Sequence, residues 1–211
     1  QDGMKSQTME LRARQVGPWL MNTYALVCPH TGQSVLIDPG DDPDTLSEML
    51  DGTTPVAILL THTHPDHVGA LDEMRQRLGV PLAAFDGPHL NGLALDEEIA
   101  LRDGDAFPVG EHTLRVYHTP GHIPDQICFV VEGDTIAVVG DTLFDGGPGK
   151  TWSAEGFRET LQSLRTVLRW PDETVCYPGH GPHFRLGDRR AQIESFMARD
   201  HGDFFGDAAW D

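Results

Sequence analysis

An uninterrupted apolar run at residues 56–60, Val-Ala-Ile-Leu-Leu, leads directly into the histidine-rich stretch THTHPDH at residues 61–67. A short apolar run of this kind is typical of a β-strand buried on both faces, as happens where helices cover a sheet. Side chains two residues apart in an extended segment share a face, so His62 and His64 point the same way. Two imidazoles on one side can bind the same metal ion, which predicts a metal site at the end of this strand.

The second half of the same stretch adds further ligand types. Pro65 ends the strand, and the following turn presents Asp66 and His67 together. The chain has 11 histidines, and three of them fall between residues 62 and 67, which disfavours a polar loop with incidental histidines. Neutral imidazole and carboxylate suit zinc and also iron or manganese.

Three more polar motifs follow predicted strands further along the chain. They are TPGH at 119–122, GDT at 140–142 and PGHG at 178–181, and each places a histidine or an aspartate on a turn after a strand. Loops at strand ends are where rigid scaffolds present functional side chains. We therefore expect these motifs to gather with residues 61–67 at a common edge of the sheets.

Apolar periodicity predicts strands and helices in both halves of the chain. Strands are predicted at residues 22–28, 34–38, 56–60, 80–85, 112–118, 126–131, 135–139 and 174–177, and helices at 43–51, 68–78, 154–169 and 188–199. Residues 91–103 are expected to form an irregular acidic stretch. Two groups of strands with helices in each half predict an α/β fold of two sheets packed face to face, with helices outside.

The chain shows no Pro-, Gly- or Ser-rich linker, so residues 1–211 are expected to form a single domain. Residues 1–8 are expected to be a tag remnant or a disordered end. The N-terminus lacks the apolar segment of a signal peptide, and no apolar stretch approaches the ~20 residues of a membrane span. Cys28, Cys128 and Cys176 lie in apolar runs and are expected to be buried free thiols, which favours a cytoplasmic location.

The charge balance restricts the expected partners. Acidic residues outnumber basic residues by 33 to 15, for a formal net charge of -18. Such a chain repels nucleic-acid phosphates and anionic membranes at long range, so neither is expected as a partner. A small-molecule substrate is expected instead, and the sequence leaves the oligomeric state open.

Together, the motifs THTHPDH at 61–67, TPGH at 119–122, GDTLF at 140–144 and PGHG at 178–181 resemble those of the metallo-β-lactamase superfamily, and within it the glyoxalase II (hydroxyacylglutathione hydrolase) branch. Their order and spacing match from about residue 22 to about residue 199. The resemblance implies a four-layer αββα sandwich with two divalent metal ions, zinc in the first place, at one edge. It also implies a ligand set: His62, His64 and His122 for the first metal, Asp66, His67 and His180 for the second, and Asp141 as the bridge.

The chain resembles glyoxalase II more than the class B β-lactamases. The commonest of those carry Arg where His67 stands, and those that keep the histidine lack an aspartate like Asp141. In glyoxalase II a basic residue and a following aromatic residue contact glutathione, and Lys150 and Trp152 fall on those positions. His183, just after the last motif, is a further candidate for the substrate site.

Two departures separate the chain from glyoxalase II. Only about thirty residues follow the PGHG motif, so we expect no room for that family's C-terminal helical domain and its further basic contacts to glutathione. Residues 123–125, Ile-Pro-Asp, replace the small or hydroxyl residues common after TPGH. His30, His89, His112 and His201 are interpreted as loop or surface histidines, and His118 as a hydrogen-bonded strand histidine.

The implied ligand set predicts hydrolysis. Two divalent ions lower the pKa of a bound water, so a hydroxide attacks a carbonyl carbon without a protein nucleophile. Asp66 and Asp141 are the expected catalytic residues, because Asp66 orients the nucleophile and Asp141 holds the two cations together. The first hypothesis is a dinuclear zinc thioesterase that acts on small acyl thioesters. The alternatives are a mononuclear-iron persulfide dioxygenase, an acyl-homoserine lactonase and, last, a non-catalytic binding protein.

Overall fold

The chain folds into two six-stranded sheets, and the computed structural model describes residues 8–211. The expectation of a tag remnant or disordered end concerns residues 1–8, and residues 1–7 lie outside the described residues. The first sheet has the strand order β1-β2-β3-β4-β5-β6, and the second has the order β14-β13-β10-β9-β8-β7. A small third sheet pairs β11 with β12.

The first sheet contains β1 (Glu10–Val16), β2 (Met21–Val27), β3 (Gln33–Ile37), β4 (Thr54–Leu59), β5 (Leu82–Phe85) and β6 (Ile99–Leu101). The second contains β7 (Ala106–Val109), β8 (His112–His118), β9 (Ile127–Val131), β10 (Ile136–Gly140), β13 (Val175–Pro178) and β14 (Phe184–Arg185), and the third contains β11 (Leu143–Phe144) and β12 (Gly147–Pro148). The helices are α1 (Pro43–Met49), α2 (Pro65–Val68), α3 (Leu71–Leu78), α4 (Ala154–Val167), α5 (Leu186–Ala198) and the short 3-10 turn Leu90–Gly92.

Alternation of side chains along the strands explains how the sheets pack. Leu26, Ile37 and Leu59 point into the core between the two sheets, where Leu114 and Phe129 meet them from the second sheet. Because neighbouring residues on a strand face opposite sides, the residues in between form a second apolar face on the outside. Both sheets are therefore buried on two faces and need a cover of helices.

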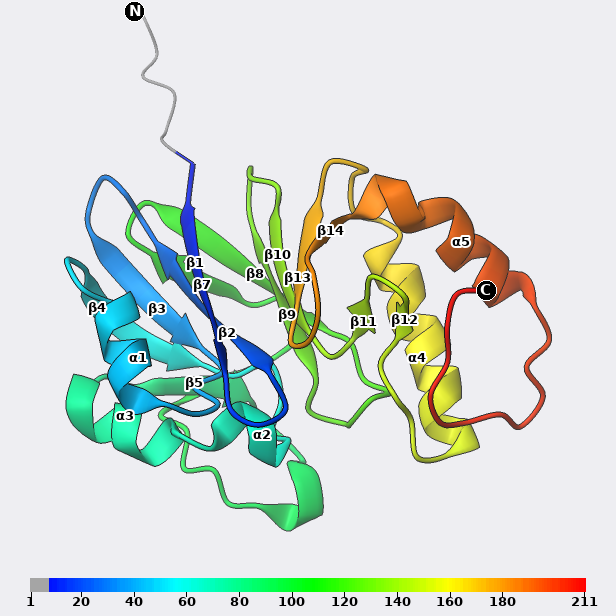
Figure 1. Cartoon of the computed structure of the whole chain (residues 1–211), viewed down its shortest axis with the longest axis horizontal. Coiled ribbons are helices and arrows are strands. Elements are labelled where there is room, and N and C mark those ends of the chain that lie inside the picture. Colours follow the sequence, from blue (N-terminus) through cyan, green and yellow to red (C-terminus); the bar gives the residue numbers. More distant parts are fainter. Residues whose placement is uncertain (1–7) are drawn as a thin grey trace, which may run out of the picture.

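Helices supply that cover on both sides, as Figure 1 shows. Leu46 of α1 and Met74 of α3 pack against the outer face of the first sheet. Leu164 of α4 and Ile193 of α5 pack against the outer face of the second sheet. The four-layer αββα sandwich expected from the sequence is confirmed. The description of the chain as a single domain stays a prediction.

The helix predicted at residues 68–78 is wrong at its start. The structure has α2 at Pro65–Val68, and α3 begins only at Leu71. Gly69 lies between the two helices, where a Cβ atom would come within 2.3 Å of the Gly40 carbonyl oxygen. The Ala70 N–H donates to the Pro39 carbonyl at 3.0 Å, so contact with the loop after β3 breaks the helix here.

Several strands were missed because they lack a clear apolar period. β1, with the sequence ELRARQV, is largely exposed at the edge of its sheet, so polar residues occupy both faces. β6 lies inside the segment expected to be irregular, and β7 and the two-residue β14 were not predicted. The expectation of buried free thiols at Cys28, Cys128 and Cys176 is confirmed. None of the helices described between residues 8 and 211 has the length and apolar character to cross a membrane.

Candidate metal centre

The predicted ligand motifs meet because five strands end at the same edge of the sandwich. β3 runs parallel to β4, and β10 runs parallel to β13. β8 has the same direction as β10, since each pairs antiparallel with β9. The two sheets are joined at this edge, where the Ile127 N–H donates to the Thr61 carbonyl at 2.8 Å and the Tyr24 hydroxyl donates to the Pro178 carbonyl at 2.6 Å.

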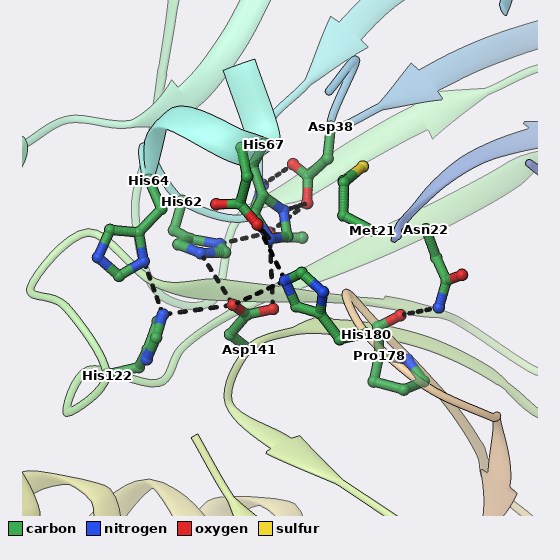
Figure 2. Close-up of polar contacts among 12 residues, drawn as sticks. Met21, Asn22, Asp38, His62, His64, His67, His122, Asp141, Pro178 and His180 are labelled. Carbon is green, nitrogen blue, oxygen red and sulfur yellow. Dashed lines mark hydrogen bonds and ion pairs between the residues drawn. The ribbon is translucent and has the colours of Figure 1, made fainter. Parts of the chain in front are cut away.

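Four side chains from three of these strand ends form the first group of ligands (Figure 2). His64 Nδ1 lies 2.7 Å from His122 Nε2, and His122 Nε2 lies 3.3 Å from Asp141 Oδ2. His62 Nε2 approaches the same carboxylate oxygen at 3.5 Å. Ligand atoms of all four residues lie within 4.8 Å of one another, so a single cation can reach them together.

Asp66, His67 and His180 form the second group. His180 Nε2 lies 2.9 Å from Asp66 Oδ2, and His67 Nε2 lies 3.6 Å from the same oxygen. Asp141 faces this group as well, because its Oδ1 lies 3.3 Å from His67 Nε2 and its Oδ2 lies 3.7 Å from His180 Nε2. The structure thus brings every sequence-predicted ligand to one place, with Asp141 between the two groups.

Unpaired buried atoms show that these residues fit metal ions. Within the described residues, His62 Nε2, His67 Nε2 and Asp141 Oδ1 are buried without a hydrogen-bond partner. Leaving one buried polar atom unpaired costs about 1–3 kcal/mol, so three of them at one point call for a partner that the protein does not supply. Imidazole nitrogens and carboxylate oxygens are the donor atoms that divalent cations of this kind accept.

Asp38 orients two of the ligands and was missed by sequence reasoning. Its Oδ2 lies 2.9 Å from His67 Nδ1 and accepts a hydrogen bond from the Thr61 hydroxyl at 2.5 Å. Thr61 Oγ1 in turn lies 3.0 Å from His62 Nδ1. Each contact occupies the Nδ1 atom and leaves Nε2 free for a cation. Asp38 follows directly after β3, and its place at a strand end was the signal that could have identified it.

Two further features hold the ligands in place. His122 Nδ1 donates to the Lys150 carbonyl at 2.8 Å, which directs its Nε2 toward the centre. Gly179 allows a close approach of the chain, because a Cβ atom there would lie 2.2 Å from Asp141 Oδ1 and 2.5 Å from His67 Cε1. Only glycine leaves room for both ligands at this position.

Burial and neighbouring charges lower the basicity of the first histidines. Burial holds the pKa of His62 well below its usual range, and the nearby His67 adds to this effect. Burial also lowers the pKa of His64 to about 4, with the neighbouring His122 as the next cause. Both imidazoles are therefore neutral at physiological pH and have a nitrogen lone pair available.

Charge pairing has the opposite effect on the second group. Burial acts to lower the pKa of His67, but the carboxylate of Asp141 outweighs it and raises this pKa well above its usual range. The hydrogen bond from His180 to Asp66 raises the pKa of His180. Burial acts to raise the pKa of Asp141, and the positive charge of His67 outweighs it, so this carboxyl group is ionised.

A cavity of about 850 Å³ opens onto the ligands and contains two of the predicted substrate-binding residues. Lys150 and Trp152 line it, and the exposed Trp152 ring lies 5.3 Å from the rings of both His64 and His122. Lys150 Nζ lies 5.8 Å from the centre of the Trp152 ring and 3.6 Å from Asp207 Oδ2. The loop that follows Asp141 therefore returns to the metal edge.

The structure does not bring the third candidate, His183, to this cavity. His183 is exposed, and its ring stacks on Tyr177 of β13 with centroids 5.2 Å apart. It is absent from the residues that line the cavity, all of which lie in the described part of the chain. The reason is geometric: after Gly181 the chain enters β14, which pairs with β13 and carries His183 along the sheet.

His89 differs from its interpretation as a loop or surface histidine. It lies in the loop between β5 and β6, but its side chain is only 8 % exposed. His118, in contrast, is hydrogen-bonded as expected, since its Nε2 donates to the Pro124 carbonyl at 2.8 Å. The surroundings of His89 were invisible in the sequence because its partner, Asp125, lies 36 residues away.

The C-terminal segment, residues 199–211, packs against the loop that carries Lys150. Its Trp210 donates from the backbone N–H to the Gly146 carbonyl and from the ring Nε1 to the Asp145 carbonyl, both at 3.0 Å. The Thr151 N–H donates to the Gly206 carbonyl at 3.2 Å. In Figure 1 this segment runs back beside β11 and β12. It delivers Asp207 to the wall of the cavity.

Comparison with known families gives a match over most of the chain. The model of the metallo-beta-lactamase superfamily matches residues 16–180, which include every residue of the two ligand groups. The chain is 34% identical over 194 residues to the probable metallo-hydrolase YqgX of Bacillus subtilis (strain 168), with 82% of this chain and 91% of that protein covered.

A second relative is the hydroxyacylglutathione hydrolase of Bradyrhizobium sp. (strain ORS 278), which is 35% identical over 161 residues. The match covers 74% of this chain and 61% of that enzyme, so the chain spans about three fifths of its length. Among solved structures, the BLEG-1 B3 metallo-beta-lactamase superposes with a TM-score of 0.77 at 29% identity, covering 86% of this chain and 97% of that one. The protein TTHA1623 in a di-iron-bound form superposes with a TM-score of 0.71 at 30% identity, covering 85% of this chain and 96% of that one.

Proposed function

This chain belongs to the metallo-beta-lactamase superfamily, and from that membership we propose that it is a dinuclear metallo-hydrolase that hydrolyses small acyl thioesters. The observation that carries the proposal is the position of Asp141. One of its oxygens faces His67, and the other faces both His62 and His122 at 3.3–3.5 Å. A carboxylate shared in this way can serve two cations at once, with His62, His64 and His122 on one and Asp66, His67 and His180 on the other.

The chemistry that two divalent cations supply at such a centre is Lewis acidity, which polarises a carbonyl group and lowers the pKa of water. The residues of the chain contribute orientation. Asp66 lies at the cavity side of the centre, and its carboxylate is ionised because the hydrogen bond from His180 lowers its pKa against the effect of burial. It can accept a hydrogen bond from an attacking water and direct an oxygen lone pair toward the substrate.

Hydrolysis of a thioester then needs no protein nucleophile. The water oxygen forms a bond to the acyl carbon, the carbon–sulfur bond breaks, and the released thiol carries a proton. A thioester fits the cavity because Lys150 offers one positive charge to an anionic thiol carrier and Trp152 offers an apolar surface beside the ligands. The relatives named hydroxyacylglutathione hydrolase favour the same substrate class.

Zinc is the proposed metal because imidazole and carboxylate donors suit it. The di-iron form of TTHA1623 makes iron the alternative. Elemental analysis of protein purified without added metal tests this part of the proposal. About two equivalents of zinc or iron per chain support a dinuclear centre, whereas a single iron per chain favours the dioxygenase.

The decisive experiment measures kcat/KM of metal-loaded protein for one member of each substrate class. S-lactoylglutathione is followed by thiol release, an N-acyl-homoserine lactone by acid release, and glutathione persulfide by sulfite formation. We expect the thioester to give the highest kcat/KM, and we expect Asp141→Asn to abolish the activity. A higher kcat/KM for the lactone or the persulfide would overturn the thioesterase proposal.

Hydrolysis of β-lactams is the second candidate, because the BLEG-1 B3 metallo-beta-lactamase shares 29% identity over most of this chain. The chromogenic cephalosporin nitrocefin tests it in the same panel. Both reactions require attack by water on a carbonyl carbon, so the metal centre by itself does not discriminate between them. A kcat/KM for nitrocefin above that for the thioester would make β-lactams the preferred substrates.

A further inference from the structure

The Ile-Pro-Asp departure after the TPGH motif places a buried carboxylate next to the metal centre. Asp125 is 2 % exposed, and both of its oxygens accept hydrogen bonds. Oδ1 accepts from the Thr63 backbone N–H at 3.3 Å, and Oδ2 accepts from the Thr63 hydroxyl at 2.5 Å. Oδ2 also lies 3.0 Å from His89 Nδ1. Burying a carboxylate costs free energy unless hydrogen-bond partners satisfy it, so Asp125 depends on these contacts with Thr63 and His89.

The contact between Asp125 and Thr63 joins two of the three loops that carry the first group of ligands, the ones that hold its histidines. Thr63 stands between His62 and His64, and Asp125 follows three residues after His122. The side chains that flank this contact are the ones that meet at 2.7 Å, His64 Nδ1 and His122 Nε2. Fixing Thr63 to Asp125 therefore fixes the spacing of these two imidazoles.

His89 attaches a third segment, the loop of residues 86–98, to the same carboxylate. The Leu90 backbone N–H also donates to Thr63 Oγ1, at 3.4 Å. His89 Nε2 is buried without a hydrogen-bond partner among the described residues, and its nearest acidic atom, Glu97 Oε1, is 3.6 Å away. The anchoring of His89 therefore depends on its contact with Asp125.

The anchored loop forms one wall of a second cavity beside the metal centre. This cavity has a volume of about 560 Å³, and Leu90 and Asn91 line it together with His64, His122 and Trp152. The opposite end of the loop is held separately, where Arg75 donates to the Leu95 and Asp96 carbonyls. The network thus contacts the part of the loop that lines this cavity.

We propose that Asp125 and His89 are positioning residues with separable roles: Asp125 holds the ligand-bearing Thr63 segment against the His122 loop, and His89 holds the wall of the second cavity. The substrate-binding half of this proposal rests on the proposed thioesterase function. The half that concerns the metal does not rest on that function, because it predicts a cation affinity that is measured without any substrate.

The first test compares His89→Ala with His30→Ala. His30 also pairs with a carboxylate, Glu111, but it is exposed and lies outside the network. His89→Ala should increase hydrogen–deuterium exchange of the amides in residues 86–98 about tenfold, because local opening costs less once the anchor is removed. It should raise KM for S-lactoylglutathione about tenfold, because the wall of the second cavity loses a hydrogen bond to a charged group and is no longer held in place. The kcat and the Zn²⁺ affinity should stay nearly unchanged. His30→Ala should change none of these quantities.

The second test uses Asp125→Ala and measures Zn²⁺ affinity by chelator competition. The affinity should fall about 10- to 100-fold, as it does when partners that orient metal ligands are removed. Exchange in residues 86–98 should rise as it does in His89→Ala. The Thr63→Val and Thr63→Ser pair repeats the test without removing the carboxylate: valine should lower the affinity and serine, which keeps the hydroxyl, should restore it.

The outcomes separate this proposal from the proposed function. Unchanged Zn²⁺ affinity in folded Asp125→Ala, or equal affinity in Thr63→Val and Thr63→Ser, would overturn the role of Asp125. Unchanged exchange in His89→Ala would overturn the role of His89. A wild-type protein that hydrolyses no thioester would contradict the thioesterase, whereas the Zn²⁺ and exchange measurements would still decide this proposal.

Discussion

Asp141 is the residue on which the two ligand groups depend. It follows directly after β10, and its side chain lies between the two groups (Figure 2). Oδ2 faces His122 of the first group and His180 of the second, and Oδ1 faces His67 of the second. His67 holds it in the ionised state, since the charge of this imidazole lowers the pKa of Asp141 against the effect of burial. An amide in this place would keep the shape of the side chain and lose the negative charge that two neighbouring cations need.

The first prediction follows from this loss of charge. Asp141→Asn should lower kcat for the thioester by about a thousandfold or more, because even residues that only support a metal ligand contribute about 10- to 100-fold. Metal content and kcat are measured on the same preparations. A variant that retains two metals and a near-normal rate would remove Asp141 from the centre.

The second prediction concerns the pH dependence of metal loading. His64 has a pKa of about 4, and the pKa of His62 is also lowered, so cations at the first group displace no proton from these residues at neutral pH. His67 and His180 have raised pKa values, so each remains protonated to higher pH and must release a proton to bind. Affinity at the second group should therefore rise by about tenfold per pH unit for each displaced proton, through the neutral range.

Titration with Co²⁺ between pH 5.5 and pH 8 checks this difference. The affinity for the second equivalent should rise more steeply with pH than the affinity for the first. Parallel pH dependence of both equivalents would show that the two groups do not differ in proton competition.

At the scale of elements, the loop between β10 and α4 and the C-terminal segment together form the wall of the larger cavity. The loop presents Lys150 and Trp152, and the C-terminal segment presents Asp207. Lys150 therefore has an acidic neighbour, 3.6 Å from its Nζ, that competes with any anionic group of a substrate. The cavity therefore offers the basic side chain of Lys150 to a substrate, and Asp207 weakens the attraction of this side chain for an anionic group.

The third prediction is that Lys150→Ala raises KM for S-lactoylglutathione about two- to fivefold with little change in kcat. An exposed charge contact contributes ~0.2–1 kcal/mol, and this contact lies away from the reacting carbonyl, so it stabilises ground and transition states equally. Asp207→Asn is the matched variant and should lower KM by a similar factor. An unchanged KM in both variants would show that the thiol carrier binds elsewhere.

At the scale of the whole molecule, the metal centre is separate from what holds the fold together. Three apolar cores lie between the sheets and under the helices on each side, and none of them includes the proposed metal ligands. The ligands lie at the edge, where hydrogen bonds to Asp38, Thr61 and the Lys150 carbonyl support them. Metal removal should therefore leave the scaffold intact.

The fourth prediction states this for chelated protein. Treatment with EDTA should abolish hydrolysis and leave the far-UV circular dichroism spectrum unchanged, because a core of this size folds without a metal. The melting temperature should fall, since cations that bind only the folded state stabilise it by mass action. An unfolded spectrum after chelation would contradict the separation of centre and scaffold.

Local sequence predicted the order of most elements, and the resemblance of its motifs to those of the metallo-β-lactamase superfamily implied all the proposed metal ligands. The alternation in β8 and the apolar run of β4 depend only on side chains a few residues apart, so they were visible without a structure. The motifs that contain His62, Asp141 and His180 each follow such a strand, and a ligand's place at a strand end is also a local property. Polar edge strands such as β1 have no comparable signal.

Tertiary structure alone decided which strand ends meet and what surrounds them. Asp38 orients His67 across 29 residues, Asp125 holds His89 across 36, and Lys150 supports His122 across 28. Such contacts depend on strand pairing and on how the sheets stack, which short-range periodicity does not encode. The same reason explains why His183 was expected at the site: its sequence position lies beside a ligand, and the pairing of β14 with β13 carries it away.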